Sequence, residues 1–179
     1  MTSAPGLPDG NKKNSLDSKG PLGCGGSHAA VLSAARLAAV QALYQIALAD
    51  TSAREVIEEF LSYRLGAEGE ESVVGADRTL FVSLVEGVAA RSEELNSMIA
   101  ANLADDWSME RVPPILLAVL RAGTFELLAC EKVPPRVVIT EYLNIAHSFF
   151  EDREPAFVNA VLDRLAHVLR EDGWETTSP

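Results

Sequence analysis

The stretch that decides the fold reads Phe157-Val158-Asn159-Ala160-Val161-Leu162-Asp163. Apolar residues recur along it and beyond it at helical spacing, which predicts a helix with one buried face. The members of this apolar stripe are Phe157, Val161, Leu165 and Val168. Asn159 and Asp163 stand four residues apart, so they share another part of the helix surface. The helix therefore carries a core face and a polar pair that needs an explanation.

The whole chain has the composition of packed amphipathic helices. Of its 179 residues, 47% are hydrophobic and only 6% are aromatic, and charged residues are scattered rather than grouped. A chain of this length holds one domain with a core of ordinary size. The sequence therefore predicts an all-α fold.

Hydrophobic periodicity and helix-breaking residues divide the chain into six expected helices. They cover residues 28 or 29 to 49, 53–65, 77–103, 115–130, 136–150 and 154 or 155 to 169. The helices before and after the turn at Trp107 form two groups joined through the long helix 77–103. Two helical bundles packed together are the expected architecture.

The two ends of the chain lack such periodicity. Residues 1–27 are rich in Gly, Ser, Pro and Asn, and we expect a flexible N-terminal tail there. Residues 171–179 are expected to form a frayed C-terminus. The folded domain is accordingly placed at residues 28–170.

The net charge of −11 argues against non-specific binding to nucleic acid. Nearly all of this acidity lies outside residues 1–28, so any RNA binding has to be local or shared with a basic partner. No apolar stretch is expected to reach the length of a bilayer span, and no signal peptide is recognised, so we expect a cytoplasmic protein that does not bind membranes.

The residue pattern also speaks against an enzyme. The two cysteines, Cys24 and Cys130, are too few for a disulfide framework. Neither they nor His28, His147 and His167 have metal-ligand spacing, and no Gly-rich phosphate loop follows a strand. We expect no catalytic residue, no metal and no cofactor.

Four motifs occur along the chain in a fixed order. They read ARLAAVQALYQ at 35–45, VLRAGTFEL at 119–127, VITEY at 138–142 and FVNAVLD at 157–163. In this order and spacing they resemble the NusB family of bacterial transcription antitermination factors. The resemblance covers about residues 30 to 170, and four motifs in register make a specific signal.

The resemblance implies an all-helical RNA-binding protein without catalytic activity. Members of this family bind the boxA element of ribosomal RNA leader transcripts, together with a small-subunit ribosomal protein that doubles as the factor NusE. The pair joins RNA polymerase and other Nus factors so that transcription resists termination. These partners are therefore expected for this chain.

The resemblance also implies site residues. The implied RNA-binding residues are Ser33, Arg36, Phe149, Phe150, Arg153, Phe157 and Asn159. The implied contacts to the protein partner are Arg111, Leu116 and Leu117. Many relatives carry several arginines where this chain reads Leu32-Ser33-Ala34-Ala35, and only Arg36 is retained.

Two of these assignments have structural alternatives. Arg36 either contacts a phosphate or is an ordinary surface arginine paired with a carboxylate. Of Phe149 and Phe150, at least one is expected to close the core, while the other stacks on an unpaired base beside Arg153. Both arginines are expected at the surface.

Asn159 also has two interpretations. A buried amide on a helix can hold a neighbouring loop through hydrogen bonds, which is the favoured role, and the alternative is an RNA contact. Arg121 is expected to pair with Glu126 or Asp163 inside the bundle.

Two rival functions remain at this stage. A similar helical domain is attached to certain ribosomal RNA cytosine methyltransferases, but such an enzyme needs a following α/β domain, and this chain ends at Pro179. The other rival is a protein scaffold that has lost RNA binding along with its arginines. Salt-dependent RNA binding discriminates the scaffold from an RNA-binding factor.

Overall fold

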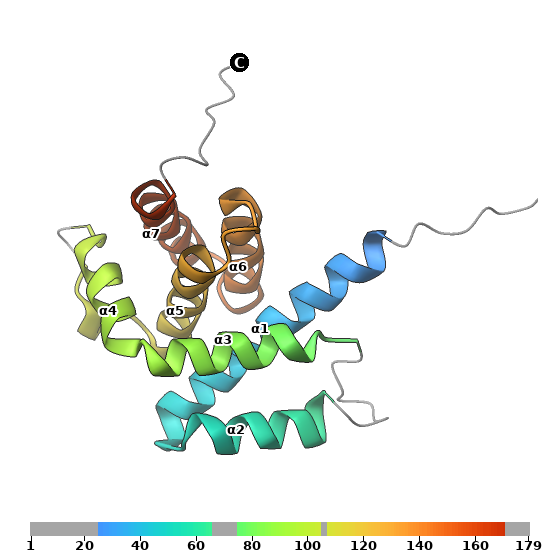
Figure 1. Ribbon diagram of the computed structural model, residues 1–179. Helices are drawn as coiled ribbons and strands as arrows, with labels where there is room; N and C mark the ends of the chain where they lie inside the picture. Colours follow the sequence, from blue (N-terminus) through green and yellow to red (C-terminus); the bar gives the residue numbers. More distant parts are fainter. Residues whose placement is uncertain (1–24, 66–74, 105–106, 171–179) are drawn as a thin grey trace, which may run out of the picture.

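The computed structural model describes residues 25–65, 75–104 and 107–170, and these are helical without any strand (Figure 1). The predicted all-α class is confirmed. The helices are α1 (Gly25–Ala49), α2 (Ala53–Glu59), a π-helical turn (Phe60–Arg64), α3 (Arg78–Ala90), α4 (Ser92–Ala101), a 3₁₀ turn (Met109–Arg111), α5 (Pro114–Ala129), α6 (Pro135–Phe149) and α7 (Arg153–Leu169).

Helix α5 lies at the centre of the fold. It packs against α1, α3, α4, α6 and α7. Its sequence is apolar on nearly every side, and a helix of that kind is stable only when other helices surround it. Pro114 begins the helix, where the missing N–H of proline costs no hydrogen bond. The other helices are thus arranged around α5.

The helices form two groups, as expected, but the division falls elsewhere. α1, α2 and α3 pack on one another, with α2 and α3 side by side in Figure 1. α5, α6 and α7 pack together as the second group. α4 contacts α5 and α7, so it joins the second group although it precedes Trp107. α5 belongs to both groups because it also contacts α1 and α3.

The expectation of one long helix over residues 77–103 is wrong, because the helix is interrupted at Arg91. This residue has φ −119° and ψ 22°, outside the helical region. Its guanidinium binds the Glu94 carboxylate at 2.7 Å, and acidic residues in the first turn favour a new helix start. The break turns α4 onto α5 and α7 and buries Leu95 and Ile99.

Smaller corrections concern α1 and α7. α1 begins at Gly25, so the helix takes in the last residues of the expected tail, whereas residues 1–24, 66–74 and 171–179 lie outside the described ranges. Val168 is 66% exposed, so the apolar stripe of α7 ends before it.

The expectation that no stretch reaches the length of a bilayer span is wrong for α1. Residues His28–Ala49 are long and apolar enough to cross a membrane by length and composition. However, α1 packs against α3 and α5, and the side chains of Ala35, Ala39 and Val40 are fully buried there. The middle of the helix is therefore part of the core, whereas Leu48 near its end is 61% exposed.

Arg170 closes the second helical group just after α7. Its guanidinium donates hydrogen bonds to the carbonyls of Leu127 at 2.7 Å, Cys130 at 2.7 Å, Glu131 at 2.9 Å and Val133 at 3.0 Å. Carbonyls at the end of a helix have no partner within the helix, and a cation is favourable there. Arg170 therefore fixes the end of α5 and the turn to α6.

A tight contact between α3 and α5 generates the first prediction. A Cβ added at Gly87 would lie 2.0 Å from Cζ of the buried Phe125 ring. Although Ala favours helices over Gly, we expect Gly87→Ala to lower the free energy of unfolding by about 1 to 3 kcal/mol, because the ring has to move. Urea unfolding measures this.

The matched background for this test is Phe125→Leu, which removes the ring atoms. Gly87→Ala should cost clearly less stability there than in the wild type. A stabilising Gly87→Ala in the wild-type chain would show that the helices do not approach so closely.

Candidate nucleic-acid interface

Arg36, the expected phosphate contact, lies in the core and is only 4% exposed. It forms a bidentate ion pair with Glu126 of α5, whose side chain is fully buried. Arg36 Nη2 lies 2.6 Å from Glu126 Oε1, and Nε lies 2.9 Å from Oε2. The Tyr142 hydroxyl of α6 donates to the same Oε2 at 2.9 Å. Three helices thus meet at one carboxylate.

A second carboxylate extends this network toward the surface. Glu141 Oε2 accepts from Arg36 Nη1 at 3.2 Å and from the Ser33 hydroxyl at 2.5 Å. The Glu141 side chain is 21% exposed. Ser33 and Arg36, which stand close together on α1, therefore both bind α6 in this structure.

The protonation states in the network follow from burial and charge. Burial alone lowers the pKa of the Arg36 guanidinium, but the hydrogen bond and the charge of Glu126 outweigh it and raise that pKa. Burial, reinforced by the Glu126 charge, also raises the pKa of the Tyr142 hydroxyl well above its usual value. Arg36 is thus charged and Tyr142 is neutral at physiological pH.

These contacts correct the expectations for Arg36 and Arg121 and show what Ser33 binds. Arg36 is not a surface residue, so neither of its surface interpretations holds, although it does pair with carboxylates. Ser33 is half-buried and already bonded. Arg121 pairs with neither Glu126 nor Asp163, because its Nε donates to Oδ1 of Asn96 at 2.8 Å, and burial lowers its pKa.

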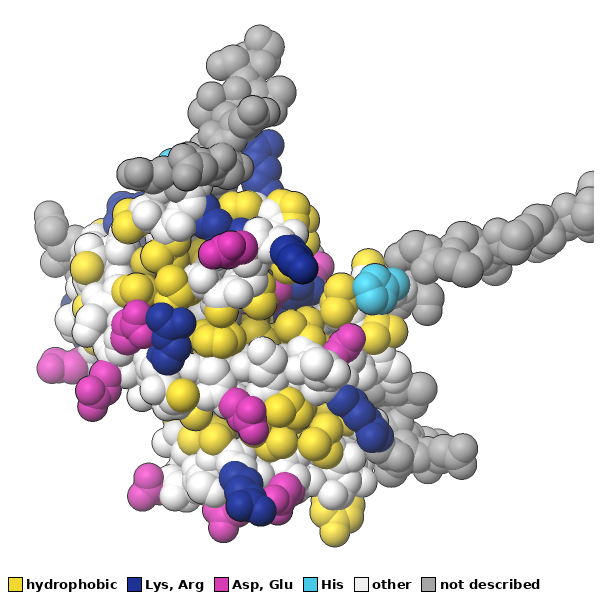
Figure 2. All heavy atoms as spheres, in the orientation of Figure 1, with side chains coloured by type: hydrophobic (Ala, Val, Ile, Leu, Met, Phe, Trp, Pro, Cys, Tyr) yellow, Lys and Arg dark blue, Asp and Glu magenta, His cyan; other side chains and the backbone are white. Residues whose placement is uncertain are grey.

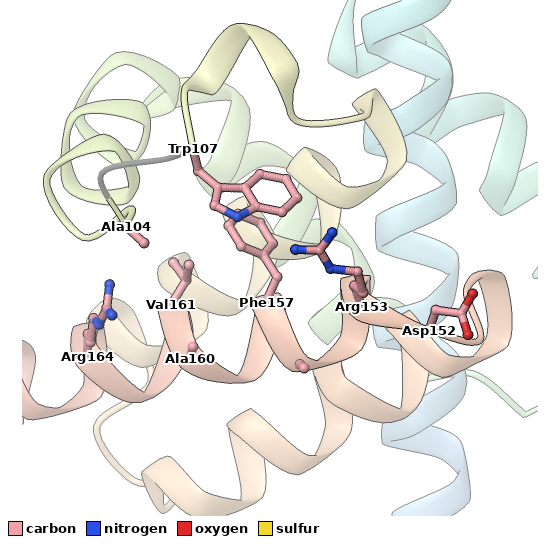
Figure 3. Close-up of a pocket in the computed structure, with 9 residues that line it drawn as sticks. Ala104, Trp107, Asp152, Arg153, Phe157, Ala160, Val161 and Arg164 are labelled. Carbon is pink, nitrogen blue, oxygen red and sulfur yellow. The ribbon is translucent and has the colours of Figure 1, made fainter.

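A groove of about 400 Å³ lies along α7 and the segment that leads into α5 (Figure 3). It brings together two predicted RNA-binding residues, Arg153 and Phe157. The described residues that line it are Ala104, Trp107, Asp152, Arg153, Ala156, Phe157, Ala160, Val161 and Arg164. This groove is the candidate nucleic-acid interface, and we call it the α7 groove.

The α7 groove combines an aromatic pair with arginines. The rings of Trp107 and Phe157 are stacked, with centroids 4.1 Å apart and planes inclined by 23°. Figure 3 shows the Arg153 guanidinium directed toward this pair, while Arg164 rises from α7 beyond Val161. Arg164 Nη1 donates to the Asn102 carbonyl at 3.0 Å. Flat aromatic faces beside guanidinium groups suit single-stranded nucleic acid.

The two phenylalanines at the end of α6 have different environments. Phe150 is half-buried and packs against the core, in agreement with the expectation that at least one closes it. Phe149 is 41% exposed and lies in another groove, with Tyr44 and Ile115. The structure therefore does not bring Phe149 into the α7 groove.

Asn159 is exposed, so its favoured role as a buried amide that holds the fold is wrong. It is not among the residues that line the α7 groove. Its neighbour on that face, Asp163, lies 3.7 Å from Nδ1 of His167. The polar pair that marks this helix is thus a surface feature.

The expectation that Leu116 contacts a protein partner is wrong, because this side chain is fully buried on α5. Leu117 is half-buried and packs against the core, and Arg111 is exposed. Of these three residues, only Arg111 and part of Leu117 are accessible to a partner.

The sequence interpretation missed Trp107 and Arg164. Arg164 could have been found, because Arg153, Phe157, Ala160 and Arg164 follow one another at helical spacing. Trp107 lies outside the expected helices, and its position against α7 depends on the tertiary fold.

The fold and the α7 groove define a class, namely an all-helical protein with a groove lined by an aromatic pair and arginines. Among the described residues, no group of three or more His, Cys, Asp or Glu side chains could hold a metal ion. The chain belongs to the NusB family, whose family model matches residues 33–167.

Individual relatives agree with this family. The chain is 49% identical over 138 residues to the transcription antitermination protein NusB of Sinorhizobium fredii (strain NBRC 101917 / NGR234), covering 76% of this chain and 86% of that protein. It is 49% identical over 140 residues to the protein of the same name from Maricaulis maris (strain MCS10), covering 78% and 88%. A solved structure of T. maritima NusB matches with a TM-score of 0.62 and 26% identity, covering 75% of this chain and 89% of that chain.

The buried network generates the second prediction. Arg36→Ala leaves the Glu126 carboxylate without its cation inside the core, so we expect the free energy of unfolding to fall by about 3 to 5 kcal/mol. Chemical denaturation monitored by circular dichroism measures this loss. Replacing both partners with apolar residues, as in Arg36→Met with Glu126→Leu, should recover much of it.

Arg54→Ala is the matched control, because Arg54 pairs with Glu58 at 2.9 Å on the exposed surface. This control should unfold almost as the wild type does. An Arg36→Ala protein of normal stability that had lost RNA affinity would instead restore the phosphate-contact interpretation.

Proposed function

We propose that this protein is a transcription antitermination factor that acts on ribosomal RNA leader transcripts. It binds their boxA-type single-stranded RNA together with a small-subunit ribosomal protein acting as NusE. RNA polymerase and other Nus factors join through this complex in the cytoplasm, and no catalysis takes place. Membership of the NusB family supports the proposal, because the similar proteins are named transcription antitermination proteins.

The proposal of RNA binding is supported by the composition of the α7 groove. It offers the stacked pair Trp107 and Phe157 together with the exposed guanidinium of Arg153. Proteins recognise unpaired RNA by stacking its bases on aromatic rings and by binding its phosphates with cations. Phe149 and Asn159, both exposed, are further proposed RNA contacts outside the groove.

The charge of the protein explains why a partner is needed. Because the charge of Arg36 is compensated by Glu126 and Glu141, α1 has no free arginine. On the face shown in Figure 2, basic and acidic side chains are interspersed rather than sorted into patches. RNA releases counterions only where cations of the protein neutralise its phosphates, and the net charge of −11 opposes such contacts. A basic ribosomal protein would supply the missing positive charge.

The proposed partner surface is limited to what is accessible. It includes Arg111 in the 3₁₀ turn and the exposed part of Leu117 at the start of α5. Leu116 has no part in it because it is buried.

The third prediction concerns the partner. We expect the isolated protein to bind boxA-type RNA weakly and its complex with the ribosomal protein to bind it much more tightly at near-physiological salt. Fluorescence anisotropy of a labelled RNA, with a scrambled RNA as control, measures both affinities. If the partner changes nothing, the proposed division of charge between the two proteins does not hold.

The fourth prediction assigns one phosphate contact to Arg153. Arg153→Ala in the partner complex should weaken matched and scrambled RNA alike and reduce the salt slope by roughly 0.7. Stability should barely change, because Arg153 is exposed. Arg54→Ala on α2 is the control for the loss of one positive charge. A salt slope identical to that control would favour the scaffold function.

A further inference from the structure

We propose that the α7 groove is a pocket for one unpaired RNA base, in which Trp107 provides the stacking face and Arg153 and Arg164 bind the flanking phosphates. This inference rests on the proposed RNA-binding function and refines its site. It makes Trp107 a specific binding residue rather than a part of the turn between α4 and α5.

Small side chains leave the space for the base. Ala156 and Ala160 are exposed on the side of α7 that lines the groove, and Ala104 lines it from the segment after α4. The resulting volume of about 400 Å³ stays open between two parts of the backbone. Larger side chains at these three positions would fill it.

The stacking face is already in place. Trp107 is half-buried and rests on Phe157, whose side chain is only 9% exposed because it packs into the core as well. The Trp107 ring is therefore held by a fixed neighbour. A ring that is ordered before binding loses little conformational freedom when a base stacks on it.

The charges along the groove fit an anionic ligand. Arg153 and Arg164 both lie on α7, about 16 Å apart along its axis at 1.5 Å per residue. They therefore serve the two ends of the groove rather than one phosphate. Among the described residues that line the groove, Asp152 is the acidic one, and Figure 3 shows its carboxylate directed away from the aromatic pair.

The aromatic pair lies between Arg153 and Arg164 in the groove. This arrangement is complementary to a nucleotide base that lies between two phosphates. An RNA duplex does not offer this combination, because its bases are stacked and paired inside the helix. The pocket is accordingly specific for single strands.

The test combines a protein variant with a series of RNAs. The probe is a boxA-type single-stranded RNA and a set of copies that each lack one base, and the protein is the full chain in complex with the ribosomal protein. Trp107→Leu removes the flat ring but keeps an apolar side chain, whereas Trp107→Phe keeps a ring. Thermal unfolding shows that each variant is folded.

We expect Trp107→Leu to weaken binding of the intact RNA by roughly 5- to 150-fold, the range of one base–aromatic stack, and Trp107→Phe to weaken it much less. One abasic RNA should bind the wild type as weakly as the intact RNA binds Trp107→Leu. With that RNA, Trp107→Leu should cause no further loss. Annealing the RNA to its complement should also remove the difference between wild type and variant.

A fluorescence measurement reports on the same contact. The chain has two tryptophans, so Trp174→Phe leaves Trp107 as the only one. The emission of Trp107 should be quenched by the intact RNA. It should not be quenched by the abasic RNA that lacks the base stacked on Trp107.

The outcomes separate this inference from the proposed function. If wild type binds no RNA with or without its partner, the RNA-binding function fails. If wild type binds, Arg153→Ala weakens binding, and Trp107→Leu behaves as wild type on every RNA, the base pocket is refuted while the function stands. Losses that are equal for all abasic RNAs would mean that Trp107 only supports the fold, and they refute the pocket as well.

Discussion

The carboxylate of Glu126 is the constraint on which the rest of the structure depends. It is fully buried on the central helix α5, where an uncompensated charge would be strongly destabilising. The Arg36 guanidinium from α1 and the Tyr142 hydroxyl from α6 both bind it. A rotation of any of the three helices about its axis would move its polar group away from this contact. The network thus selects one packing among the many that apolar helices would allow.

The same interaction removes Arg36 from the side chains that are free for the proposed contact with RNA. Arg36 is the arginine of α1, and its hydrogen bonds are directed at Glu126 and Glu141. A residue type that suggests phosphate binding therefore serves the core instead. The exposed arginines of α7 remain as cations beside aromatic rings. Arg36 is thus taken up in the core, while the groove along α7 has Arg153 and Arg164 in its lining.

Local pattern was sufficient for most helices, and tertiary contacts account for the errors. The bounds of α5 and α6 were predicted to within one residue, because Pro114 and Pro135 mark the starts of strongly apolar segments. The break at Arg91 was missed, since neither Gly nor Pro marks it. The burial of Arg36 could not be predicted, because Glu126 lies 90 positions away along the chain.

The α7 groove shows how far a sequence pattern can lead toward a site. Helical spacing places Arg153, Phe157 and Arg164 near one face of α7, and the resemblance to the family had already selected the first two. The pattern did not contain Trp107, which comes from the segment before α5 and completes the aromatic pair. Phe157 belongs to both the core and the groove, so packing of the core sets the position of the stacking face. The proposed recognition of RNA would therefore depend on the stability of the second helical group, and substitutions that loosen α7 should affect both together.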